Sequence, residues 1–262
     1  MRLWVFAILL FSMNGFSIDT SDPLIAKEPR LGLLSGYFSR KVRFFQTPAE
    51  NPQGKCVVLV HGWGVRGSSM RKMADALAKE GYDVFRYDYP SSKWPIAEQT
   101  ALFLASYRKL VEQLPQNEKI FFLTHSMGGL LLRGAMAEMT EAECKRIEAI
   151  VMLGPPNHGS KLAYLGKIPG IKQINQSLGD MAPTEDNYAL KLPRPQWIPP
   201  IAILAGKYDG KVSVESTHLP EEIPYEHQIV FCTHPGLRNP KNTLSFILEF
   251  YARDFKESHC SP

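Results

Sequence analysis

The chain has 262 residues, a net charge of +4 and 44% hydrophobic residues, which are ordinary values for a folded globular protein and exclude wholesale disorder. Its 30 basic and 26 acidic residues are interspersed without a run of five like charges, which argues against a nucleic-acid-binding stripe. Four cysteines in a chain of this length do not make a disulfide scaffold.

Residues 1–17 have the pattern of a secretory signal peptide. Arg2 gives a positive start, Leu3–Phe11 is continuously apolar, and Gly15 and Ser17 are small residues at a spacing that suits cleavage. The apolar run is too short to span a bilayer, which takes roughly 20 residues. We therefore expect cleavage near Ser17 and export to the periplasm or the medium. An uncleaved anchor and a misassigned start are the alternatives.

From residue 56 onward, predicted strands alternate with predicted helices. The strands are expected at 56–60, 82–87, 120–123, 149–153, 201–204 and 229–231, and the helices at 69–79, 96–114, 127–139 and 243–255. Before them, residues 18–34 are expected to be an irregular lead-in and residues 37–46 one or two edge strands. The alternation predicts one α/β domain over 18–262, with a mostly parallel central sheet covered by helices on both faces.

Residues 155–199 interrupt the alternation. This stretch of about 45 residues is rich in Pro, Gly and Asn, and a structureless loop of that length is uncommon unless it is functional. Apolar residues recur in it at loose helical spacing: Leu162, Tyr164, Leu165, Ile168, Ile171, Ile174 and Leu178. We expect a small cap-like insert of short helical pieces whose apolar side chains pack over a pocket at the carboxyl ends of the strands. A surface excursion that covers the sheet edge is the alternative.

Residues 120–128 read I-F-F-L-T-H-S-M-G, a buried strand that turns sharply at Ser126 into a helix. The G-x-S-x-G nucleophile turn needs this context, because it presents a serine hydroxyl at the end of a strand. Gly128 fits the pattern, whereas Thr124 stands where the first Gly would be. The helix N-terminus behind Ser126 offers N–H groups to a developing oxyanion. The alternative is that Ser126 only caps the helix.

Three segments resemble the α/β-hydrolase superfamily, specifically its bacterial triacylglycerol-lipase-like esterases. They are V-L-V-H-G-W-G at 58–64, L-T-H-S-M-G-G-L at 123–130 and L-G-P-P-N-H-G-S at 153–160. The resemblance extends over about residues 55–252, with departures at Thr124 and in the shorter Pro-rich region after Ser160. It implies the α/β-hydrolase fold, hydrolysis of carboxylic esters with lipid-like acyl groups, and a catalytic triad in the order Ser, acid, His.

Asp209 is the candidate triad acid. It follows the predicted strand at 201–204 through a short loop, so its carboxylate is expected at the carboxyl end of a strand, where it can orient an imidazole. A role as a turn residue before Gly210 is the alternative. Poorer candidates, because they lie in the irregular insert, are Asp180, Glu185 and Asp186.

His234 is the candidate base. It follows the predicted strand at 229–231, and Pro235-Gly236 behind it marks a loop, which is the position of the base in the family that the chain resembles. His218, in a loop, is the second candidate. His227 is expected at the start of the strand and therefore at the opposite end of the sheet.

The resemblance also implies the oxyanion hole. The loop that carries Trp63 supplies one backbone donor, and Met127, directly after the nucleophile, supplies the other. His61 is expected to fix its loop by a hydrogen bond rather than to act as a base. His125 and His158 are expected to flank the site and shape it.

Two alternatives to ester hydrolysis remain at this stage. The same triad serves an acyltransferase, and a hydrolase fold without activity serves as a binding protein. No C-x-x-C, H-E-x-x-H or P-loop pattern is present, so neither a metal nor a nucleotide cofactor is implied. The expected partner is a small-molecule or lipid ester, with peripheral membrane contact left open. Cys56 and Cys232 adjoin apolar runs and are expected to be buried free thiols.

Overall fold

One twisted sheet organises the molecule. The structure is a computed structural model that describes residues 24–26, 42–168, 170–171 and 175–255. Within these ranges the strands are β1 (Ile25–Ala26), β2 (Arg43–Thr47), β3 (Lys55–Val60), β4 (Asp83–Asp88), β5 (Lys119–His125), β6 (Ile147–Leu153), β7 (Ile201–Gly206) and β8 (Glu226–Val230). They pair in the order β1-β2-β4-β3-β5-β6-β7-β8. Only the β2–β4 pair among them is antiparallel, so the predicted mostly parallel sheet is confirmed.

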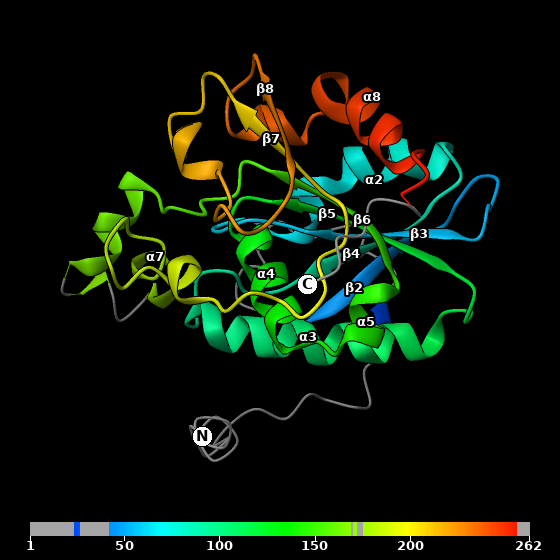
Figure 1. Cartoon of the computed structure of the whole chain (residues 1–262), viewed down its shortest axis with the longest axis horizontal. Coiled ribbons are helices and arrows are strands. Elements are labelled where there is room, and N and C mark those ends of the chain that lie inside the picture. Colours follow the sequence, from blue (N-terminus) through cyan, green and yellow to red (C-terminus); the bar gives the residue numbers. More distant parts are fainter. Residues whose placement is uncertain (1–23, 27–41, 169, 172–174, 256–262) are drawn as a thin grey trace.

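Helices cover both faces of this sheet (Figure 1). Helices α2 (Arg71–Lys79) and α8 (Pro240–Tyr251) lie on one face, and α3 (Ile96–Gln113), α4 (Met127–Glu138) and α5 (Glu141–Lys145) lie on the other. The remaining elements are short: α7 (Gln176–Gly179) and the 3₁₀ helices η1 (Gly67–Met70), η2 (Lys161–Lys167), η3 (Tyr188–Lys191), η4 (Glu215–Thr217) and η5 (Pro235–Arg238). In Figure 1, α7 stands at one edge of the molecule, away from the two helical layers.

The central strands are apolar throughout because both of their faces are buried. In β3, Val58 and Val60 pack on the α3–α4 side, whereas Val57 and Leu59 pack on the α2–α8 side. Successive side chains of a strand point to opposite faces, so a strand between two helical layers needs apolar residues at every position. This arrangement accounts for the continuous apolar runs in the sequence.

The edge strand β8 differs from its predicted range. It spans Glu226–Val230 rather than 229–231, and Phe231 lies beyond it with 75% of its surface exposed. An edge strand with a solvent-facing side accepts polar residues, so the first half of β8 carries no apolar signal. Helix α8 likewise begins three residues before the predicted position, because Asn239 caps it and Pro240 suits its first turn.

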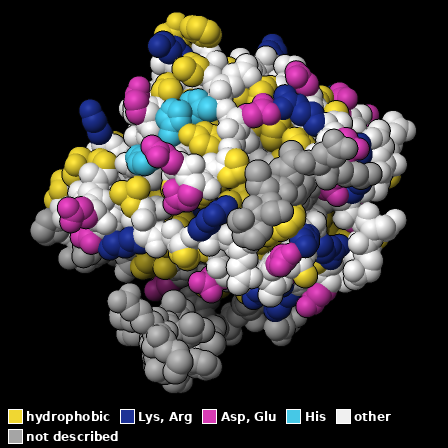
Figure 2. Space-filling model, in the orientation of Figure 1, with side chains coloured by type: hydrophobic (Ala, Val, Ile, Leu, Met, Phe, Trp, Pro, Cys, Tyr) yellow, Lys and Arg dark blue, Asp and Glu magenta, His cyan; other side chains and the backbone are white. Residues whose placement is uncertain are grey.

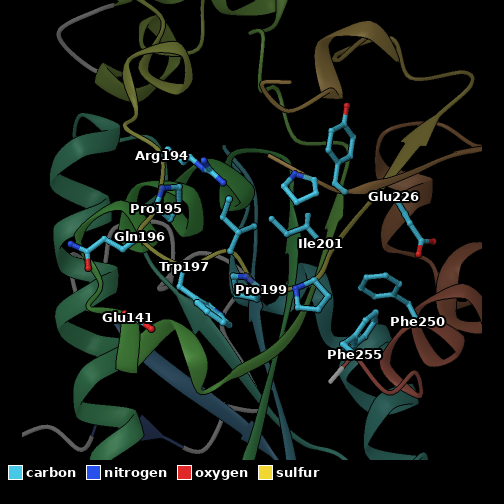
Figure 3. A pocket seen from close by; sticks show the side chains of 14 residues that line it. Glu141, Arg194, Pro195, Gln196, Trp197, Pro199, Ile201, Glu226, Phe250 and Phe255 are labelled. Atoms are coloured by element: carbon cyan, nitrogen blue, oxygen red, sulfur yellow. The ribbon is translucent and has the colours of Figure 1, made fainter. Parts of the chain in front are cut away.

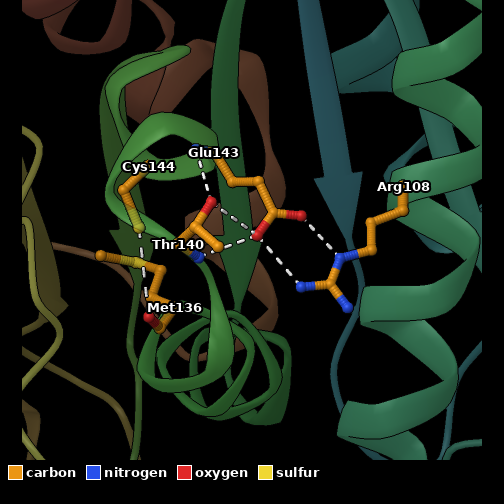
Figure 4. Close-up of polar contacts among 5 residues, drawn as sticks. All are labelled: Arg108, Met136, Thr140, Glu143 and Cys144. Atoms are coloured by element: carbon orange, nitrogen blue, oxygen red, sulfur yellow. Dashed lines mark hydrogen bonds and ion pairs between the residues drawn. The ribbon is translucent and has the colours of Figure 1, made fainter.

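Helix α5 was not expected from the sequence, and a capping box specifies it. The Thr140 side chain accepts a hydrogen bond from the Glu143 backbone, and the Glu143 carboxylate accepts one from the Thr140 backbone. The same carboxylate binds Arg108 of α3 in a bidentate pair with N–O distances of 2.6 and 3.0 Å (Figure 4). These bonds connect α5 to α3 and lower the pKa of Glu143 to about 2, with the Arg108 hydrogen bond as the largest cause.

Several expectations fall wholly or partly outside the described residues. These are the signal peptide at 1–17, most of the lead-in at 18–34, residues 37–41 of the expected edge strands, and Cys260. Cys56 and Cys232 are buried free thiols as expected, and Cys144 is a third. No helix in the described ranges is both long and apolar enough to cross a membrane.

The aromatic cluster between the sheet and α3 gives a stability prediction. Phe103 of α3 is fully buried, and its ring centroid lies 5.2 Å from that of Tyr87 and 6.2 Å from that of Phe122. Phe103→Ala should lower the free energy of unfolding by about 3–5 kcal/mol. Phe231→Ala, at an exposed position, is the matched control and should change it by less than about 0.5 kcal/mol. Equal effects in urea unfolding would contradict this account of the core.

Candidate active site

Ser126 stands at the turn between β5 and α4 with an unusual backbone. Its φ of 54° and ψ of −126° make it the sole non-glycine residue at positive φ in the described part of the chain. Such a conformation costs about 1–3 kcal/mol and persists only where the surroundings impose it. The Ser126 N–H donates to Leu153 O of β6 at 2.8 Å, and the Gly129 N–H donates to Ser126 O at 2.9 Å. The turn has the geometry that the nucleophile motif requires.

Two glycines let this turn contact the loop after β3. A Cβ atom on Gly128 would collide with the carbonyl oxygen of Val60 at the end of β3. A Cβ atom on Gly62 would lie 2.8 Å from the Cβ of Ser126. Because no side chain fits at either position, the loop after β3 and the serine turn are held against each other.

Asp209 and His234 are brought together by the ends of β7 and β8. The His234 Nδ1 and the Asp209 Oδ2 lie 2.5 Å apart, and the Asp209 side chain is fully buried. The other carboxylate oxygen, Oδ1, accepts hydrogen bonds from the N–H groups of Lys211 and Val212 at 2.8 and 2.9 Å. With Nδ1 donating to the carboxylate, Nε2 is the basic nitrogen of His234.

Ser126, His234 and Trp63 line one small cavity of about 50 Å³. Among the described contacts no hydrogen bond joins Ser126 to His234. In serine hydrolases the hydrogen bond between the serine and the histidine often becomes short only when substrate is bound. Asp209 is bonded to His234 but does not line the cavity itself. The Met127 side chain is buried in the core. The apolar residues of the 155–199 segment that line the cavity are Pro156, Leu162, Ala163, Leu178 and Met181.

The rest of this segment divides between core and surface. Tyr164, Leu165 and Ile168 are each nearly half exposed, whereas Ala163 and Leu178 are buried. Ile174 lies outside the described residues. The segment thus contributes both to the cavity wall and to an exposed apolar surface, and its description as a cap stays a prediction.

The buried histidines beside the site make structural contacts. The His61 Nδ1 donates to Gly62 O at 2.9 Å, and its Nε2 accepts from the Tyr89 N–H at 3.4 Å, so His61 fixes its loop. The His125 Nε2 donates to His234 O at 3.1 Å, and its Nδ1 is buried without a partner in the described part of the chain. Burial lowers the pKa of His61 to about 4 and holds that of His125 well below 6.5.

The role of the two expected oxyanion donors stays a prediction. Within the described residues, neither the Trp63 N–H nor the Met127 N–H donates a hydrogen bond. The Trp63 indole, in contrast, donates to Asn175 Oδ1 at 2.9 Å. This bond connects the loop after β3 to the 155–199 segment, and nothing in the sequence predicts it.

The other candidate residues lie elsewhere. His218 stacks on His227 with ring centroids 4.1 Å apart and bonds the Tyr225 hydroxyl, and neither histidine lines the cavity of Ser126. Histidine side chains gather on the face of the molecule shown in Figure 2. Asp180 accepts a hydrogen bond from the N–H of Ile96, and Asp186 pairs with Lys191.

A larger cavity of about 620 Å³ lies near the starts of β7 and β8 (Figure 3). Trp197, Pro199 and Phe250 are among the residues that line it, with Glu141 and Glu226 at its margins. Parallel sheets bind substrates at the carboxyl ends of their strands, whereas this cavity adjoins Ile201 and Glu226 at the amino ends. We therefore place the candidate active site at the smaller cavity.

The fold and the serine turn are those of an α/β hydrolase. A model of the alpha/beta hydrolase family matches residues 57–244, and the chain belongs to that family. No curated protein matches the sequence. In the described part of the chain, no group of three or more His, Cys, Asp or Glu side chains is placed to hold a metal ion.

Solved structures of several enzymes share the fold. The mature lipase BlEst2 from Bacillus licheniformis is 18% identical with a TM-score of 0.62, over 79% of this chain and 97% of that one. A bromoperoxidase from Bacillus anthracis is 19% identical with a TM-score of 0.54, over 81% and 95%. The type II thioesterase BorB of the borrelidin biosynthetic cluster is 18% identical with a TM-score of 0.55, over 81% and 97%. At these identities the similarity establishes the fold alone.

Burial of His61 gives a pH prediction. Its pKa falls from 6.5 to about 4 on folding, so between these values the unfolded chain binds a proton that the folded chain does not. The contribution of His61 to the free energy of unfolding is therefore fully present above pH 6.5. It decreases as the pH falls toward 4, by about 2 kcal/mol between pH 7 and 5. His61→Asn, which keeps a side-chain donor, should reduce the pH dependence of the unfolding free energy by that amount. An unchanged slope would exclude His61 as its source.

Proposed function

We propose that the protein is a serine hydrolase that cleaves carboxylic esters through an acyl-enzyme on Ser126. The observation that carries the proposal is the convergence of a strained serine turn and an Asp209–His234 hydrogen bond on one cavity. Ser126, His234 and Asp209 then act as nucleophile, base and acid. The family contains mostly hydrolases, so its membership supports the reaction class without specifying the ester.

Each triad residue has a defined step. The His234 Nε2 takes the Ser126 hydroxyl proton as the oxygen attacks the ester carbonyl carbon. The N–H groups of Trp63 and Met127 hold the resulting oxyanion, and each is worth roughly 3–4 kcal/mol if well aligned. His234 returns the proton to the departing alcohol. Water then attacks the acyl-enzyme with His234 again as base, which releases the acid and restores Ser126.

The surroundings of His234 suit a transient positive charge. The buried Asp209 carboxylate stabilises the imidazolium from one side. Burial, and after it the nearby His234, hold the pKa of His125 well below its ordinary value, so the His125 ring stays neutral. His125 therefore donates a hydrogen bond to the His234 carbonyl and does not repel a positive charge on the His234 ring.

An acyl-enzyme of this kind also reacts with alcohols. If the 155–199 segment excludes water, an acceptor alcohol would replace water in the second step, and the protein would be an acyltransferase. Product analysis with an added alcohol separates the two reactions: free acid identifies a hydrolase, and a new ester identifies a transferase.

Loss of the nucleophile or the base should abolish activity. Ser126→Ala should lower kcat by roughly 10⁴–10⁶-fold, and His234→Ala should be about as severe. The double variant should lose little more, because triad residues act as a unit. The measurement is hydrolysis of a p-nitrophenyl ester, together with labelling of Ser126 by a fluorophosphonate.

His218→Ala is the matched control for these variants, since His218 lies outside the cavity. It should retain most of the activity. Retention of a tenth of the activity by Ser126→Ala would contradict the assignment of Ser126 as the nucleophile. A severe loss of activity in His218→Ala would identify His218 as the base. A folded protein that neither reacts with the probe nor cleaves any ester would favour a binding function.

The apolar wall gives a prediction about the acyl group. Each acyl CH₂ that packs against Leu162, Leu178 and Met181 should contribute about 0.8 kcal/mol, or nearly fourfold in kcat/KM. The gain should continue from acetate until the small cavity is filled and then level off. A p-nitrophenyl ester series from acetate to octanoate measures it. A series that is flat throughout would contradict an apolar acyl site.

A further inference from the structure

The cavity of Ser126 contains a cation without a matching anion. Arg238, at the end of η5 and four residues after His234, lines this cavity. Its Nη1 reaches Ser69 O only at 3.5 Å, and its Nε is buried with no partner in the described part of the chain. Burial is the cause that lowers its pKa, and no carboxylate nearby raises it.

Lys211, an exposed residue, is a second cation among the residues that line the same cavity. Its backbone is fixed, because its N–H binds Asp209 Oδ1 at 2.8 Å and its carbonyl accepts the Ser160 hydroxyl at 2.6 Å. Its side chain makes no ion pair with any described residue. None of the residues that line the cavity is an Asp or a Glu. The residues that line the cavity therefore include two cations and several apolar side chains, without a carboxylate among them.

Other arginines in this structure show what Arg238 lacks. Arg66 pairs with Asp88 at 2.7 Å, and Arg108 pairs with Glu143 at 2.6 Å. The more deeply buried Arg133 donates to Asn157 Oδ1 and Ala189 O at 2.8 and 3.2 Å. Arg238 makes only the 3.5 Å bond to Ser69 O among the described contacts, so its Nη groups keep donors that a ligand can bind, whereas its Nε is enclosed by the protein.

We propose that the substrate of Ser126 is an ester that also carries an oxyanion group, a carboxylate or a phosphate, and that Arg238 receives this group with Lys211 beside it. The inference rests on the proposed function and specifies its substrate class. The planar guanidinium fork matches both oxyanions, which accept two parallel N–H bonds. The apolar wall from η2 and α7 remains available to the uncharged part of the ester.

Two matched substrate pairs test this. Ethyl pentanoate and monoethyl glutarate differ by a methyl group against a carboxylate, and monobutyroylglycerol and its phosphate monoester differ by the phosphate. The enzyme should prefer the charged member of at least one pair by about 10- to 100-fold in kcat/KM, the range expected of hydrogen bonds to a charged group. The pair that shows the preference identifies the oxyanion. High salt should reduce it.

Arg238→Met keeps the apolar stem and removes the charge, and it should bring the preference to within about threefold of unity, mainly through KM. Arg238→Lys should restore only part of it, because an ammonium lacks the fork. The matched control is Lys241→Met, which removes one exposed charge of α8 outside the cavity and should leave the preference unchanged. Equal kcat/KM for both members of both pairs in the wild type would overturn the inference.

Binding to Ser126→Ala separates this inference from the proposed function. Calorimetric titration with the intact esters measures recognition without hydrolysis, and the charged esters should bind more tightly, with the difference lost on Arg238→Met in the same background. If the wild type cleaves no ester while this difference persists, the proposed function fails and the oxyanion site stands. If the wild type cleaves esters while both members bind equally, the proposed function stands and the oxyanion site fails.

Discussion

The strained backbone at Ser126 is the constraint on which the rest of the site depends. A φ of 54° is unfavourable for serine, and the fold stabilises it from three directions. A carbonyl of β6 accepts a hydrogen bond from the Ser126 N–H. The first turn of α4 fits against the end of β3 only because Gly128 has no side chain, and the loop after β3 fits against Ser126 only because Gly62 has none. Tight packing of two apolar layers on the sheet makes these approaches rigid.

Burial determines the protonation of the histidines around the Ser126 turn. Burial lowers the pKa of His125, whose side chain bonds the backbone of the candidate base His234. The imidazole of His234 itself bonds the buried carboxylate of Asp209. His125 and His61, whose pKa values are lowered by burial, make hydrogen bonds that position loops. In the proposed mechanism positive charge develops on His234, and the proposed substrate supplies the negative charge that Arg238 binds.

Residues that follow strands directly were accessible from the sequence. Ser126, Asp209 and His234 each come within a few positions of a strand end, so the parallel sheet brings them to one edge. The polar half of β8 and the five-residue helix α5 gave no periodic signal. The Trp63–Asn175 bond and the unpaired state of Arg238 were also inaccessible, because each depends on segments far apart in the chain; Trp63 and Asn175 are separated by 112 positions.

The hydrogen bond between the Trp63 indole and Asn175 has a consequence for how specificity can change. Trp63 contributes its backbone to the expected oxyanion hole and its side chain to the segment that forms the cavity wall. A substitution or length change in that segment would alter the anchor of the residue to which the proposed mechanism assigns an oxyanion donor. If the proposed function holds, substrate selection and turnover rate are coupled through this bond, and a redesign of the wall for a larger ester must preserve or rebuild the anchor of Trp63.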